Sequence, residues 1–83
     1  MAVPQHSKEL VAHVVEILRE QRESLGVSKK LLAARAGVSR TAIILMEAGK
    51  RLPSLELVVK LAVSLDVSFS TIVRNAEKRI NRA

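Results

Sequence analysis

Lysine and arginine are concentrated in the middle of the chain, where they point to binding of a polyanion. Residues 28–51 carry six basic side chains and one acidic side chain, so they supply most of the chain's net charge of +6. The six are Lys29, Lys30, Arg35, Arg40, Lys50 and Arg51. Such a segment favours a nucleic acid, because each phosphate that a cation neutralises releases condensed counterions. The alternative is a solvated charged face that only keeps the protein in solution.

Catalytic chemistry has little support in the sequence. The chain has no cysteine, which excludes disulfides, thiolate nucleophiles and cysteine-ligated metals. Its two histidines, His6 and His13, belong to no cluster with metal-ligand spacing, and no glycine-rich phosphate loop is present. We therefore expect no catalytic residue, no metal site and no cofactor, and we do not expect an enzyme.

Length and composition indicate one domain with an aliphatic core. The chain has 83 residues, 48% of them hydrophobic, and Phe69 is its single aromatic residue. A platform of stacked aromatic rings for single-stranded nucleic acid is therefore excluded.

The longest clean apolar run, residues 42–46, is far shorter than a membrane span, and the N-terminus lacks the pattern of a signal peptide. We expect a cytoplasmic protein with no membrane partner.

The spacing of apolar residues predicts five helices and no strands. The expected helices cover residues 8–25, 29–36, 40–48, 55–65 and 69–80. A serine stands before each helix as an N-cap, and a glycine follows each of the first three. The side chains expected to be buried include Leu55 at the start of the fourth helix and Phe69 at the start of the fifth. We predict a flexible N-terminal arm at 1–7, a compact all-α domain at 8–80 and a frayed C-terminus at 81–83.

The two short helices on either side of Gly37 are predicted to form a helix-turn-helix over residues 28–48. A three- to four-residue turn that contains glycine sets two such helices at roughly 90–120°. In the DNA-binding form of this motif, the second helix enters the major groove and the first crosses the backbone. The spacing therefore favours duplex DNA as the partner.

Residues 17–73 resemble the Xre family of lambda-repressor-like helix-turn-helix proteins. The matching segments are LREQRE at 18–23, LA at 32–33, AGVSR at 36–40, EAGKRLPSL at 47–55 and LAVSLDVS at 61–68. The resemblance implies a compact five-helix domain that binds double-stranded DNA. It also implies a transcriptional regulator, a repressor or a controller, that binds a palindromic operator as a homodimer.

Helical geometry divides the helix that starts at Arg40 into two sides. The side expected to face the protein consists of Ala42, Ile43 and Met46. The side expected to read DNA bases consists of Arg40, Thr41, Ile44 and Leu45. Arg40 can donate two hydrogen bonds to one guanine, which is the commonest specific contact. Ile44 and Leu45 depart from the polar residues of the family, so they either contact thymine methyl groups or pack against protein.

Phosphate binding is expected at the two helix starts and in the segment after the second of these helices. The candidate residues are Ser28, Lys29, Lys30, Ser39, Lys50 and Arg51. The alternative for the cations is ordinary solvated charge, and Arg35 fits that interpretation as well as any other. The resemblance further implies a pair between Arg22 and Glu47, which would orient the third helix against the first.

The fifth helix carries an apolar stripe that we predict to be a homodimer interface. The stripe consists of Ile72, Val73, Ala76 and Ile80. Two-fold pairing would place two recognition helices about 34 Å apart, one turn of DNA. The alternative is that these residues complete the core of the monomer.

A second class of function also stays open at this stage. The chain could be an antitoxin-like or other protein-interaction module with weak DNA binding or none, for which a protein partner is required. The apolar Ile44 and Leu45 favour such a module, whereas the basic start of helix 29–36 favours DNA. Strong dependence of duplex binding on salt would distinguish the two.

Overall fold

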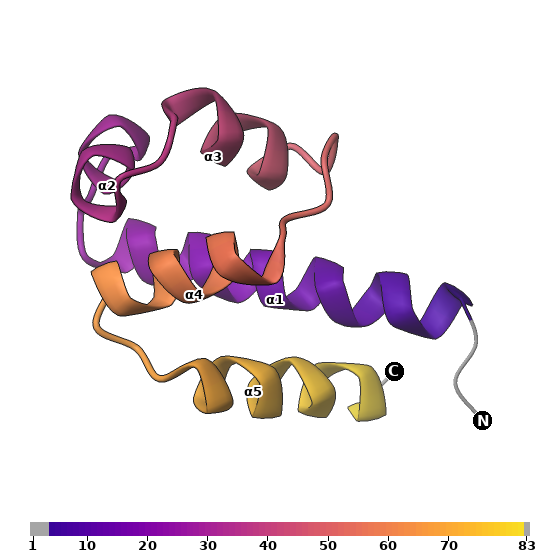
Figure 1. Cartoon of the computed structure of the whole chain (residues 1–83). Coiled ribbons are helices and arrows are strands. Elements are labelled where there is room, and N and C mark those ends of the chain that lie inside the picture. Colours follow the sequence, from indigo (N-terminus) through magenta and orange to yellow (C-terminus); the bar gives the residue numbers. More distant parts are fainter. Residues whose placement is uncertain (1–3, 83) are drawn as a thin grey trace.

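The computed structural model describes residues 4–82, with side chains from residue 6 to residue 81. Within this part of the chain there are five helices and no strand, as the apolar spacing predicted. They are α1 (Pro4–Ser24), α2 (Lys29–Ala36), α3 (Arg40–Glu47), α4 (Leu55–Ser64) and α5 (Phe69–Arg82). Figure 1 shows α1 running the length of the domain, with α2 and α3 on one side of it and α5 on the other. No helix among the described residues is both long and apolar enough to cross a bilayer.

Serine hydroxyls begin the four helices that follow α1. The Oγ atoms of Ser28, Ser39 and Ser54 each accept a hydrogen bond of 3.0 Å from the backbone N–H three residues later. Ser68 does the same for α5 at 3.2 Å. Each bond satisfies one of the N–H groups that a helix start leaves without a partner. These local signals explain why the starts of α2 to α5 could be predicted from sequence.

The first helix begins earlier than the sequence suggested. Residues 4–7 form its first turn, so the expected flexible arm at 1–7 is wrong for these residues, and residues 1–3 lie outside the described part. Pro4 is compatible with the first helical position, because a proline lacks only an N–H that would have no helical partner there. At the other end, α5 includes Asn81 and Arg82, which were expected to fray.

The core is aliphatic and lies where all five helices meet. Its fully buried large side chains are Leu18, Leu32, Ile43, Met46, Leu61, Leu65 and Ile72. Two residues expected in the core are outside it, since 67% of Leu55 and 38% of Phe69 are exposed. Both stand at the first position of their helices, where the neighbouring helix covers less of the side chain.

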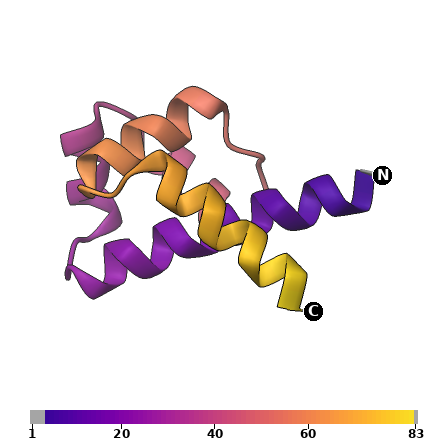
Figure 2. The same cartoon turned by 90° about the horizontal axis from the view of Figure 1, so that it is seen from below.

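An arginine clamp joins the two long helices. Arg79 of α5 donates hydrogen bonds to Glu20 of α1, the shortest of 2.7 Å, and also contacts Glu16. Arg79 is half-buried, because α5 packs across α1, as Figure 2 shows. The hydrogen bonds from Arg79 lower the pKa of Glu20 below its usual range.

Candidate nucleic-acid interface

The turn between α2 and α3 depends on the backbone of Gly37. This residue has φ +68° and ψ +36°, in the left-handed region, and the N–H of Val38 donates to the carbonyl of Ala33 at 3.0 Å. No atom lies within 4 Å of where a Cβ would stand, so the preference for glycine comes from the dihedral angles and not from crowding. Val38 then packs against the core, directly before Ser39, the N-cap of α3.

The burial of α3 follows the two sides expected from helical geometry. Ile43 and Met46 are almost completely buried, and Ala42 is half-buried. Arg40 and Thr41 are exposed, and 37% of Ile44 is exposed. Leu45 is half-buried, so of the two apolar candidates Ile44 offers more surface to a ligand. Figure 1 shows α3 along the upper edge of the domain, with α1 and α4 below it.

Arg22 and Glu47 form the ion pair that connects α1 with α3. The guanidinium Nε and Nη2 donate to the two carboxylate oxygens of Glu47, each at 2.9 Å, and Nη1 donates to the carbonyl of Val27 at 3.0 Å. Only 10% of the Arg22 side chain and 6% of the Glu47 side chain are exposed. The hydrogen bond to Glu47 raises the pKa of Arg22 further above its already high value.

This pair leaves a surface of unpaired cations around α3. Glu47 is the single carboxylate in residues 28–51, and Arg22 neutralises it. We call five residues the basic surface: Lys29, Lys30, Arg40, Lys50 and Arg51. No ion pair to any of them is found in the described part of the chain, and all are exposed except the half-buried Lys29. The five positive charges of the basic surface are therefore not balanced by any free carboxylate within residues 28–51.

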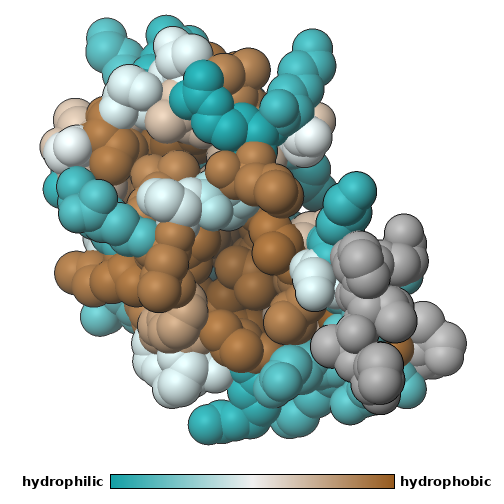
Figure 3. All heavy atoms as spheres, turned by 45° about the vertical axis from the view of Figure 1, so that its right-hand side comes forward, coloured by the Kyte–Doolittle hydropathy of each residue, from teal (hydrophilic) through white to brown (hydrophobic). Residues whose placement is uncertain are grey.

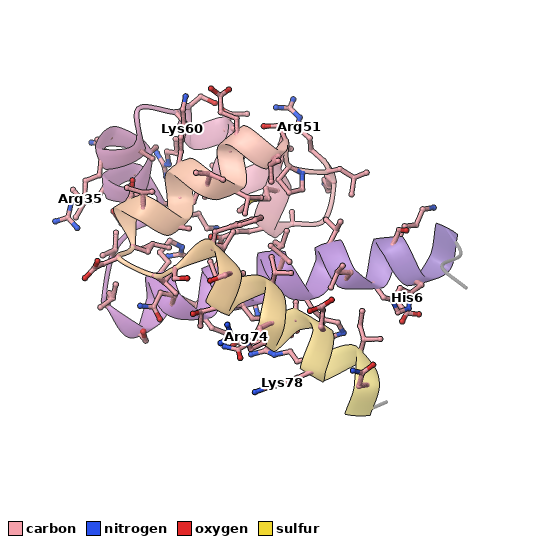
Figure 4. All side chains as sticks on the ribbon, turned by 60° about the horizontal axis from the view of Figure 1, so that its bottom comes forward. His6, Arg35, Arg51, Lys60, Arg74 and Lys78 are labelled. Carbon is pink, nitrogen blue, oxygen red and sulfur yellow. The ribbon has the colours of Figure 1, made fainter. Side chains whose placement is uncertain are left out.

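The chain immediately after α3 is held in a defined turn. The N–H of Gly49 donates to the carbonyl of Met46, and the N–H of Lys50 donates to that of Leu45 at 2.9 Å. These two bonds form a Schellman motif with Gly49 at φ +74°. Lys50 and Arg51 are thereby placed directly beyond the end of α3. Figure 4 shows Arg51 pointing away from the domain, and Arg35 doing so at the α2 end.

Two further cations reach this region from α1, and we did not predict either of them as a site residue. Lys8 and Arg19 line a groove of about 590 Å³ together with Arg51. The carboxylates of Glu16 and Glu47, which also line it, are bound to Arg79 and Arg22. Only the packing of α1 against the segment after α3 brings these cations together, and no local pattern encodes that contact.

The serines expected to bind phosphate, Ser28 and Ser39, serve as N-caps through their oxygen atoms. Because a hydroxyl both donates and accepts, each keeps its O–H for a further partner. The first N–H groups of α2 and α3 lie beside them, at the positive end of each helix dipole. Phosphate binding at these two positions stays a prediction.

The four residues predicted to form a dimer interface do not share one environment. Ile72 and Ala76 are completely buried in the monomer, so the expectation that they contact a second subunit is wrong. The reason is that α5 packs this side against the core. Val73 and Ile80 are partly exposed on the neighbouring side of α5.

An apolar groove lies beside Val73. It encloses about 250 Å³ between α1, α4 and α5. Its walls are Leu10, Val11, Val14, Pro53, Leu55, Val58, Phe69 and Val73, none of them charged. Figure 3 shows a broad hydrophobic area with a hollow on the flank that turns forward in that view. We refer to this feature as the apolar groove.

A short helix, a glycine turn and a second helix with one buried side and one exposed side define a helix-turn-helix domain. Residues 18–72 match the helix-turn-helix family, and the chain belongs to that family, in its Xre, lambda-repressor-like form. The chain is also similar to an uncharacterized HTH-type transcriptional regulator of Methanothermobacter thermautotrophicus. The two are 43% identical over 49 residues, which cover 59% of this chain and 71% of that protein. The family that the sequence motifs predicted is confirmed.

Proposed function

We propose that this protein is a transcriptional regulator that binds duplex DNA with α3 in the major groove. The observation that carries the proposal is the excess positive charge of the basic surface, because the single carboxylate within residues 28–51, that of Glu47, is bound by Arg22. Such a surface attracts a polyanion across distances of about one Debye length. Binding then gains affinity from the counterions that the polyanion releases.

The dimensions of α3 suit this role. An α-helix with its side chains is about 10–12 Å in diameter, which fits the major groove of B-DNA, about 12 Å wide. Arg40 and Thr41 stand at the N-terminal end, the part of a recognition helix that contacts base edges. Ile44 is the residue we assign to a thymine methyl group, because it is the more exposed of the two apolar candidates.

The remaining cations are assigned to the DNA backbone. Lys29 and Lys30 stand beside the N–H groups at the start of α2, which is a favourable site for one phosphate. Lys50 and Arg51 follow the other end of the recognition helix and suit a phosphate across the groove. Such contacts fix the position of the protein on the duplex but do not distinguish bases.

We also propose that two copies act together on a two-fold operator, as a repressor or controller in the cytoplasm. One recognition helix of eight residues contacts only a few base pairs, which gives little selectivity against the sites of a whole genome. A dimer doubles the sequence read and requires two half-sites about one turn of DNA apart, roughly 34 Å.

Selection of bound sites from random duplex DNA, followed by salt titration, tests the proposal. We expect an enriched two-fold sequence and an affinity that falls steeply with salt, with a log–log slope of several units. Absence of enrichment together with salt-independent binding would contradict the proposal. It would then favour the alternative, a protein-interaction module on the same fold.

A further inference from the structure

The groove between α1 and the segment after α3 combines an apolar floor with cations. It encloses about 590 Å³, and Figure 1 shows the segment between α3 and α4 passing over α1 there. Its apolar side chains are Val11, Ala12, Val15, Met46, Ala48, Leu52 and Pro53, and its cations are Lys8, Arg19 and Arg51. We call this feature the cationic groove. Its volume lies in the range of ligand-binding pockets, and Leu52 is left 71% exposed beside it.

The three cations of the cationic groove are open to an anionic ligand. No ion pair or hydrogen bond from the side chain of Lys8, Arg19 or Arg51 is found in the described part of the chain. The two carboxylates of the lining, Glu16 and Glu47, are each bound by an arginine that does not line the groove. The lining therefore presents positive charge beside apolar surface.

The other carboxylates near Arg19 on α1 are also engaged elsewhere. Glu20 binds Arg79 at 2.7 Å, and Glu23 lies 3.8 Å from Arg22. Neither of them forms an ion pair with Arg19, so this cation keeps its capacity to bind a partner.

The spacing of the cations defines the shape of the ligand. Lys8 and Arg19 are the first and last residues of α1 that line the groove. Arg19 follows Lys8 by eleven positions, which corresponds to about three turns and about 16 Å of helix, so both lie on one side of α1. Val11 and Val15 lie between them on that side. One carboxylate or phosphate cannot reach both cations, so the ligand must carry anionic groups at both ends of an apolar stretch.

We infer that the cationic groove binds an acidic amphipathic helix of a partner protein. Such a helix lays apolar residues at i, i+3, i+4 and i+7 into a groove, and about eleven of its residues span about 16 Å. Its apolar side covers Val11, Val15 and Leu52, and carboxylates at its two ends pair with Lys8 and Arg19. Charge complementarity accelerates the encounter and rejects basic partners. The DNA backbone is a poorer occupant, because its phosphates offer no apolar surface to the floor.

The cationic groove shares Arg51 with the basic surface, and this links the partner to DNA, a step that rests on the proposed function. Arg51 is assigned above to a phosphate, and an acidic helix in the groove places negative charge beside it. Occupancy of the groove should therefore weaken DNA binding. Because linkage is reciprocal, DNA should weaken the binding of the partner by the same factor. The partner is thus an antagonist of the regulator.

Titration calorimetry of the full chain with two synthetic helices tests the groove. The acidic probe has about 15 residues, with Leu at i, i+3, i+4 and i+7, Ala at the other central positions and two Glu at each end. In the neutral probe, Gln replaces every Glu. We expect the acidic probe to bind at least about tenfold more tightly, and this advantage to shrink as salt screens the charges. Equal affinity of the two probes overturns the inference.

Replacement of single cations separates the groove from the basic surface. Lys8→Ala and Arg19→Ala should each weaken the acidic probe by about threefold and leave binding to a duplex of about one helical turn unchanged. Lys30→Ala should weaken only the duplex, and Arg51→Ala should weaken both ligands. All four residues are exposed, so the fold should be retained. If Lys30→Ala weakens the probe as much as Arg19→Ala does, the probe lies on the basic surface and the inference is overturned.

The apolar part of the contact has its own matched pair of variants. Leu52→Gln should weaken both probes, because it removes apolar surface from the groove. Leu25→Gln is the control, since Leu25 is 53% exposed and does not line the groove. Equal effects of the two substitutions contradict the inference.

Competition between the probe and the duplex distinguishes failure of this inference from failure of the proposed function. Saturating acidic probe should raise the Kd of the duplex at least about threefold, and the neutral probe should not. If Lys8→Ala and Arg19→Ala each lower the salt slope of duplex binding by about one, the groove cations contact DNA and the inference is overturned. A protein that binds the duplex but neither probe also overturns it and leaves the proposed function standing. A protein that binds the acidic probe but no duplex supports the groove and contradicts the proposed function.

Discussion

The guanidinium of Arg22 on α1 binds the carboxylate of Glu47, the last residue of α3, through two hydrogen bonds of 2.9 Å. This one contact does two things. It fixes the end of the recognition helix against the longest helix of the domain, and it removes the single negative charge from the segment that carries the basic surface. Stability and electrostatics are therefore linked at Glu47.

Replacement of Glu47 by Gln should destabilise the fold by roughly 2–4 kcal/mol, because it leaves the charge of Arg22 buried without a counter-ion. Urea denaturation measures the change. Glu56→Gln is the control and should change stability by less than about 0.5 kcal/mol, since that carboxylate is 80% exposed. A double replacement of the pair, Arg22→Met with Glu47→Leu, should recover much of the loss. Equal effects of Glu47→Gln and Glu56→Gln would show that the pair contributes no more than a surface contact.

Replacement of Arg40 by Ala should cost about 1–3 kcal/mol of operator affinity and relax the preference at one base pair per half-site. The reason is the loss of two hydrogen bonds to one guanine. Binding assays on the selected operator and its single-base variants measure both effects. Arg35→Ala is the matched control at the exposed end of α2. Uniform weakening on every sequence would instead identify Arg40 as a phosphate contact.

Replacement of Lys29, Lys30, Lys50 or Arg51 by Ala should weaken all DNA sequences about equally and lower the salt slope by roughly one. Each variant removes one phosphate contact and the counterion release that accompanies it. Lys78→Ala serves as the control, because Lys78 lies on α5, away from α3 (Figure 4). If a variant in which all four cations are replaced by Ala binds DNA as well as the unmodified protein does, the assignment of this surface is refuted.

Replacement of Arg79 by Gln should destabilise the fold modestly at neutral pH, by up to about 1 kcal/mol, since the clamp is partly exposed. Arg79 lowers the pKa of Glu20 in the folded protein. The stability that Glu20 contributes is therefore complete above the pKa of the unfolded chain, about 4.3. It is lost as the pH falls through the lower pKa of the folded protein. The difference between Arg79→Gln and the unmodified protein should therefore shrink toward pH 3. Urea denaturation at several pH values checks this, with Arg74→Gln, at an exposed residue of α5, as control. A difference that stays constant or grows in acid would be incompatible with the clamp.

Local features of the sequence determined most of the fold and the orientation of the recognition helix. The serine N-caps and the glycine at residue 37 act within a few residues, so the bounds of α2 and the start of α3 follow from them. The 100° step per residue predicted that Ile43 and Met46 are buried while Arg40 and Thr41 are exposed. We did not predict that α1 starts at Pro4. Where the local signal for a helix start is weak, the start depends on how the rest of the helix packs in the tertiary structure.

The tertiary structure alone decided which apolar residues stay exposed. Helical spacing grouped Ile72, Val73 and Ala76 into one stripe, but the angle at which α5 crosses α1 buries Ile72 and Ala76 completely and leaves Val73 beside the apolar groove. The same packing decides that Arg79 binds Glu16 and Glu20 of α1, which lie about sixty residues earlier in the chain. Periodicity shows which side chains share a face of a helix. Which part of that face a neighbouring helix covers depends on contacts between residues far apart in the chain, and no local pattern contains them.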